Sequence, residues 1–169
     1  LAPFESKLVK MAATHTAVGI GTVLIAGDSG ATVVADDTTI ANQTKIIGVS
    51  LQYLAANTGG YCLCADPLNT EFEVQATVVG TANFTSEIAA VGEACSLTTS
   101  SDGGTTAIGN NATTYLSKEG LAATGVSADA CAIIQRLAPI AGNVVDATGY
   151  PVWIIRFNMA DVFGFGGGV

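Results

Sequence analysis

The chain has 169 residues, 49% of them hydrophobic and only 12% charged, and its formal net charge is −8. This length suits one domain that buries enough apolar surface to fold without disulfide or metal support, and the composition excludes a disordered chain. The six scattered cations form no basic surface, so we expect no binding to nucleic acid or to a membrane surface. No apolar run approaches the roughly 20 residues of a membrane helix, and Lys7 and Lys10 interrupt any signal-peptide pattern.

Residues 1–14 are predicted to form an N-terminal arm. Phe4, Leu8 and Met11 are spaced so that they would share one face of a short helix, which would be marginal in isolation. An apolar terminal segment is usually held in place by its own domain or by a neighbour. The arm is therefore expected to dock on one of the two.

Residues 15–160 are predicted to form a β domain, and a division into parts 15–80 and 81–160 is left open. Gly27 to Gly30 lie between two apolar runs, which is typical of a hairpin. Gly48 interrupts the third run and indicates a bulge or a close approach of a neighbouring strand. Short apolar runs bounded by Gly, Asp, Asn and Pro indicate strands at 22–26, 31–35, 45–50, 61–65, 72–79, 130–137 and 150–158.

The second half adds a helix and a polar tract. Thr85-Ser86-Glu87 is predicted to cap a short helix of about two turns, which runs through Val91 and ends at Gly92. Residues 96–114 are rich in Thr, Ser, Gly and Asn and indicate an exposed loop or a ribbon of edge strands. Trp153 lies in the most apolar strand and is expected in the core, and residues 161–169 form a Gly-rich tail. The predicted fold is all-β: a small antiparallel β-barrel or sandwich with one short helix and extended terminal arms.

Two carboxylates follow the Asp66-Pro67 turn. Glu71 and Glu73 alternate with apolar residues, so they share one face of a half-buried strand. Their separation is close to that of a glycosidase pair, which is one hypothesis for an enzyme. Alternation alone also predicts carboxylates on the solvent face of such a strand, and we favour that interpretation.

The cysteines also allow two interpretations, a functional pair or buried thiols in the core. Cys62 and Cys64 would point to one face of a strand, as a metal-binding or redox pair does. Zinc sites favour a C-x2-C spacing with further His or Cys ligands, and His15, the sole histidine, stands in a different context. We therefore expect Cys62, Cys64, Cys95 and Cys131 to be reduced and buried. The sequence contains no phosphate-binding loop or nucleophile elbow, and we predict no catalytic residue, no cofactor and no metal site.

The order of the strand and turn motifs is similar to that of head decoration, or cement, proteins of tailed bacteriophages. In those proteins a Gly-Val pair follows a strand, another strand ends in Asp-Pro, the next opens Phe-x-x-Gln, and an apolar strand closes on Arg-Phe-Asn. The similarity spans roughly residues 20 to 160. The matching motifs are Gly27-Asp28-Ser29-Gly30, Ile46-Ile47-Gly48-Val49, Tyr61 to Pro67, Phe72-Glu73-Val74-Gln75 and Ile154-Ile155-Arg156-Phe157-Asn158.

The resemblance implies a structural virion protein on the outer surface of an icosahedral capsid that is assembled in the host cytoplasm. Its partners would be the major capsid protein and further copies of itself, with a trimer favoured over a dimer. Exposed apolar residues near the termini would make these contacts: Phe4, Leu8, Met11, Phe163 and Phe165. Packing of the same residues on their own domain is the alternative. A carbohydrate-binding or adhesin-type β module is the alternative function, and it would need exposed aromatic residues in a cleft.

Overall fold

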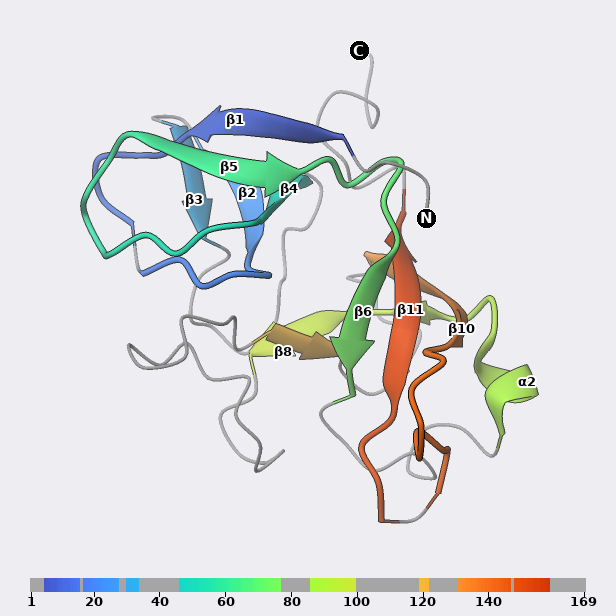
Figure 1. Cartoon of the computed structure of the whole chain (residues 1–169). Coiled ribbons are helices and arrows are strands. Elements are labelled where there is room, and N and C mark those ends of the chain that lie inside the picture. The colour runs from blue at the N-terminus through green and yellow to red at the C-terminus, as the bar shows by residue number, and fades with distance from the viewer. Residues whose placement is uncertain are drawn as a thin grey trace.

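A computed structural model describes residues 5–15, 17–27, 30–33, 46–76, 86–99, 119–121, 131–146 and 148–158. Apart from one short helix, their regular structure is antiparallel β-sheet (Figure 1). The all-β prediction is therefore confirmed, although the strands in the described ranges do not close into a barrel. None of the helices in this part of the chain is long and apolar enough to cross a membrane.

The first sheet has five strands in the order β1-β5-β4-β2-β3. The predicted hairpin is confirmed, because β2 and β3 pair from Leu24 opposite Val33 to Gly27 opposite Gly30. The ladder between β2 and β4 shifts register after Leu24, which lies opposite Gly48. The strands are β1 (Ser6–Lys10), β2 (Val23–Gly27), β3 (Gly30–Val33), β4 (Ile46–Ser50) and β5 (Tyr61–Ala65).

The helical interpretation of the N-terminal segment is wrong, because β1 is an extended strand paired with β5. The pairing places Leu8 opposite Leu63 and Val9 opposite Cys62. Lys7 reinforces it through an ion pair with Asp66, at 2.9 Å between Nζ and Oδ1. A helix of this length gains little by itself, whereas β5 offers a ready ladder of backbone hydrogen bonds.

The second sheet has four strands in the order β6-β11-β10-β7. Ser86 caps the helix as predicted, since its Oγ accepts a hydrogen bond from the Ala89 N–H. Two short strands, β8 (Leu97–Thr99) and β9 (Glu119–Leu121), pair with each other in the polar half of the chain. The remaining elements are β6 (Phe72–Gln75), the helix α2 (Glu87–Ala90), β7 (Ala94–Cys95), β10 (Ala132–Leu137) and β11 (Val152–Phe157).

Two clusters of buried side chains form the hydrophobic core and stabilise the two sheets. The larger cluster contains Val23, Ile46 and Val49 of the first sheet together with Trp153 and Ile155 of the second, so the two sheets share one core. Trp153 is fully buried, as predicted. The smaller cluster covers the other face of the first sheet and contains Met11, Val18, Leu24, Cys62 and Cys64.

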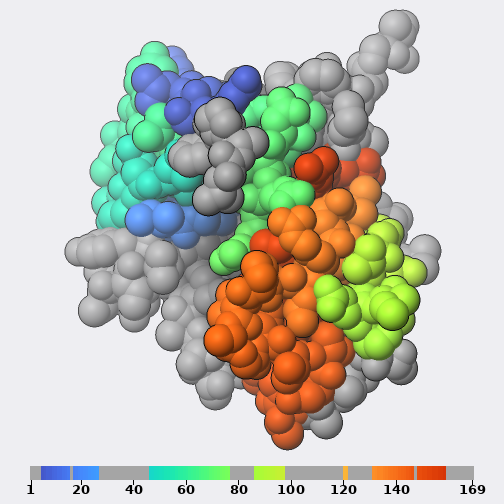
Figure 2. Space-filling view, turned by 45° about the vertical axis from the view of Figure 1, so that its right-hand side comes forward, coloured from blue at the N-terminus to red at the C-terminus, as the bar shows by residue number. Residues whose placement is uncertain are grey.

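The chain passes from one sheet to the other at residues 66–71, between β5 and β6 (Figure 1). In Figure 2 the strands β1, β2, β4 and β5 occupy one end of the molecule, and β10, β11 and α2 occupy the other. The strand β6 therefore belongs to the second sheet. The predicted tail 161–169 lies outside the described residues, as do residues 1–4 of the N-terminal arm.

Candidate interaction surface

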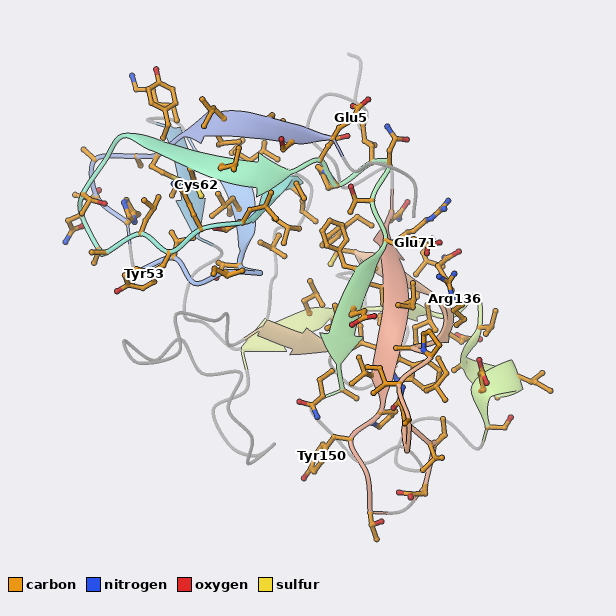
Figure 3. The ribbon with its side chains drawn as sticks, viewed as in Figure 1. Glu5, Tyr53, Cys62, Glu71, Arg136 and Tyr150 are labelled. Atoms are coloured by element: carbon orange, nitrogen blue, oxygen red, sulfur yellow. The ribbon has the colours of Figure 1, made fainter. Side chains whose placement is uncertain are left out.

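The outer face of the second sheet carries a cluster of one carboxylate and two arginines. Glu71 lies just before β6, Arg136 on β10 and Arg156 on β11, and Figure 3 shows Glu71 beside Arg136. The Arg136 guanidinium donates to both Glu71 oxygens, with its Nη2 at 2.8 Å from Oε2, and Arg156 Nη2 lies 3.2 Å from Oε1. The cluster ties the residue before β6 to β10 and β11, at separations of 65 and 85 positions in the sequence.

The arrangement bears on the two-carboxylate hypothesis. Hydrogen bonds from Arg136 hold the pKa of the Glu71 carboxyl below its ordinary value, and the charges of Arg136 and Arg156 act in the same direction. Glu71 is therefore ionised at neutral pH and is a poor proton donor. Glu73 is exposed on the same face, as the alternation predicts. The positions of both carboxylates are therefore explained by their place on the solvent-exposed face of the second sheet.

All four cysteines are buried, as expected, and none forms a disulfide. Cys62 and Cys64 point into the smaller cluster, and the Cys62 Sγ lies 3.2 Å from the Ser50 Oγ. The hydrogen bond with Cys62 raises the pKa of the Cys64 thiol, and burial acts in the same direction. Burial raises the pKa of the Cys95 thiol to about 12. The raised pKa makes the Cys64 and Cys95 thiols poor nucleophiles. The hydrogen bond with Cys64 lowers the pKa of the Cys62 thiol to about 7, but this side chain is fully buried and offers no accessible thiolate.

Within the described ranges, no group of three His, Cys, Asp or Glu side chains is placed to hold a metal ion. Trp153 is buried and therefore offers no stacking platform for a sugar. Tyr61, in contrast, is 59% exposed on β5. This tyrosine belongs to an apolar surface that the sequence analysis did not foresee.

The apolar surface consists of Leu8, Tyr61 and Leu63, and we call it the β1–β5 face. Leu8 is 68% exposed and lies directly opposite Leu63 on the neighbouring strand. Tyr61 and Leu63 alternate with the buried Cys62 and Cys64, so they point to the outer side of the same strand. Three apolar side chains on adjacent strands make a continuous exposed surface, unlike a single exposed leucine.

The five residues that were predicted to make contacts do not share one environment in the structure. Leu8 is exposed on the edge strand β1 and belongs to the β1–β5 face. Met11 is only 2% exposed and packs in the smaller cluster, so it follows the alternative of packing on its own domain. Phe4, Phe163 and Phe165 lie outside the described residues.

Tyr61 and Leu63 were missed because the contact partner of a strand cannot be read from one sequence. Their alternation with two cysteines was visible, but both faces of this strand are apolar, so the pattern does not say which face is buried. Other exposed apolar side chains lie elsewhere, shortly before β2, on α2 and just after it, and in the loop between β10 and β11: Ile20, Ile88, Val91, Ile140 and Val144.

Comparisons with known proteins identify no relative. A scan against protein-family models gives no match, and a search of curated proteins finds no similar sequence.

Proposed function

We propose that this protein is a structural virion protein, a capsid decoration or cement protein that binds the outer face of a bacteriophage head. The observation that carries the proposal is the exposed apolar β1–β5 face on a β-protein whose thiols and tryptophan are buried. Apolar surface of this kind serves association, whereas catalysis needs convergent polar groups. The strand and turn motifs shared with phage decoration proteins supply the class of partner.

The mechanism is adhesion by buried area and by repeated contacts. A shell under internal pressure gains stability when a bound protein bridges neighbouring capsomers. An oligomer that engages several equivalent sites gains avidity of about 10²- to 10⁴-fold over one site without any new kind of contact. The partners in this proposal are the major capsid protein and further copies of the same chain.

The cysteines fit assembly in the host cytoplasm. A reducing compartment disfavours disulfides, and none of the four cysteines forms one. Their burial also protects an assembled particle from disulfide exchange after release, because exchange needs an accessible thiolate. The net charge of −8 favours solubility of a particle covered by many copies.

The test is sedimentation of the purified protein with capsids that lack it. We expect saturable binding to expanded shells, with a fixed number of copies per shell and a higher temperature of capsid disruption. Shells already saturated with the protein are the control and should bind no more of it. Absence of co-sedimentation with expanded shells would refute the proposal, and binding of the protein to a glycan array would then favour the adhesin alternative.

A further inference from the structure

The strand β1 is an edge of the first sheet, and its outward backbone groups can be identified. The Asp66 N–H donates to the Glu5 carbonyl and the Met11 N–H donates to the Gly60 carbonyl, so these odd-numbered residues face β5. In an antiparallel ladder the direction of the backbone groups alternates along the strand. The N–H and C=O groups of Ser6, Leu8 and Lys10 therefore point away from β5.

In the described part of the chain, no strand pairs with that side of β1. The opposite edge of the sheet, β3, comes near β1 without forming a ladder with it (Figure 1). An edge with free backbone groups is a template for an added strand. The exposed Leu8 and Leu63 on its outer face add apolar surface for such a strand to cover.

We propose that a second copy of this chain pairs with β1 through its own β1, antiparallel and about a two-fold axis at Leu8. Such an interface is self-complementary, as two-fold symmetry requires. Ser6 would lie opposite Lys10 of the second copy, and Leu8 opposite its own equivalent. Because these residues have outward backbone groups, each would donate one hydrogen bond and accept one.

The register follows from hydrogen bonding and charge. If one β1 strand were shifted by a single residue against the other, backbone groups that point toward the second copy would lie opposite groups that point toward β5. A ladder of hydrogen bonds therefore forms only when even-numbered residues of one copy lie opposite even-numbered residues of the other. A two-fold axis at Lys7 would set two lysines directly opposite each other, which is destabilising. An axis at Val9 would set Leu8 opposite a lysine. A two-fold axis at Leu8 avoids both of these contacts and pairs every residue of β1, from Ser6 to Lys10.

The same register extends the apolar surface. In each copy Leu8 lies opposite Leu63. Pairing Leu8 with Leu8 therefore forms a row of four leucines across the joined sheets, in the order Leu63, Leu8, Leu8 and Leu63. Lysines usually protect an edge from association, but here Lys10 would face a serine and Lys7 would keep its ion pair with Asp66.

Single cysteines test this geometry, since the native cysteines are buried. Residues in a hydrogen-bonded antiparallel pair have Cα atoms about 5.5 Å apart, within the range of a disulfide. Leu8→Cys should therefore form a covalent dimer under mild oxidation, about tenfold faster than Ile88→Cys, a fully exposed control. An equal mixture of Ser6→Cys and Lys10→Cys should also cross-link.

The matched control is Ser6→Cys alone. In the proposed register its two copies lie about 13 Å apart, four residue rises along the strand, so it should not cross-link faster than Ile88→Cys. If Leu8→Cys cross-links no faster than Ile88→Cys, the proposal is overturned. That result is expected if β3 closes on β1 within one chain. Equal cross-linking by Ser6→Cys and Leu8→Cys would overturn it as well.

Solution size gives a second readout. Sedimentation equilibrium of the wild-type protein should show a monomer–dimer equilibrium, and Leu8→Asp should weaken it at least about tenfold while leaving the circular dichroism unchanged, because Leu8 is exposed. A mass of three chains would contradict the two-fold arrangement. The inference rests on the proposed function only for the role of the homo-oligomer, and it puts a two-fold dimer in place of the trimer expected from the resemblance. Because the test uses the purified protein without capsids, its failure would leave capsid binding open, and a failure of capsid binding would leave the dimer standing.

Discussion

Gly48 shows how one residue fixes the spacing of the first sheet. A Cβ added at this position would lie 2.7 Å from the Cβ of Cys64, which is closer than carbon atoms normally approach. The neighbouring atom belongs to the root of a side chain on β5, so it cannot rotate away. The glycine therefore allows β4 and β5 to pair above the smaller core cluster.

We expect Gly48→Ala to lower the free energy of unfolding by about 1–3 kcal/mol, the usual cost of forcing extra volume into a packed site. Urea unfolding monitored by Trp153 fluorescence measures the change. Gly59→Ala is the comparison, because Gly59 has a φ of +61° and open space around it, so its cost of about 1 kcal/mol comes from the backbone alone. An unchanged midpoint for Gly48→Ala would contradict the packing argument.

At the scale of elements, the Glu71 cluster ties the beginning of β6 to β10 and β11. The two arginine side chains are about half exposed, and surface ion pairs of this kind contribute no more than about 1 kcal/mol. Glu71→Gln should therefore reduce the free energy of unfolding by no more than about 1 kcal/mol at neutral pH. The reduction should shrink in high salt because the charges are screened.

The pH dependence has a definite sign. The folded state lowers the pKa of Glu71, so its stabilisation is present above the ordinary value of 4.5 and is lost as the pH falls through the lowered value. The difference between wild type and Glu71→Gln should vanish in acid. Glu73→Gln is the matched control, since no ion pair of Glu73 occurs within the described ranges. A difference that grows in acid would contradict the assignment.

At the scale of the whole molecule, the two sheets share a core and should unfold together. Val23, Ile46 and Val49 pack in the same cluster as Trp153, so loss of either sheet exposes apolar surface of the other. In a variant with Cys95→Ala and Cys131→Ala, only the first-sheet pair Cys62 and Cys64 remains to report by thiol labelling, while Trp153 fluorescence reports on the second sheet.

The two signals should share one urea midpoint. The control is the same variant in full denaturant, where both remaining thiols should react at once. Separate midpoints would mean that the sheets are independent units, each stable without the other.

The local structure of this protein follows from patterns among residues that are close in the chain. Turn residues at Gly27 to Gly30 and at Asp66-Pro67, the Ser86 cap and the alternation around Glu71 each depend on near neighbours, so a strand, turn or cap could be predicted from them. The buried state of the cysteines and of Trp153 followed from their residue types. The N-terminal segment was mistaken for a helix because a short apolar spacing carries little information without its partner strand.

Which surfaces meet depends on contacts between residues that are far apart in the chain. Lys7 and Asp66 are 59 positions apart, and Arg156 and Glu71 are 85 apart, so neither ion pair follows from a local pattern. The β1–β5 face depends on the register that sets Leu8 against Leu63, and a slip of one residue would turn those side chains to the other side of the sheet. Register arises from the packing of whole sheets. For that reason the sequence could suggest Leu8 as a contact residue, but only the fold could add Tyr61 and Leu63 and assign Met11 to the core.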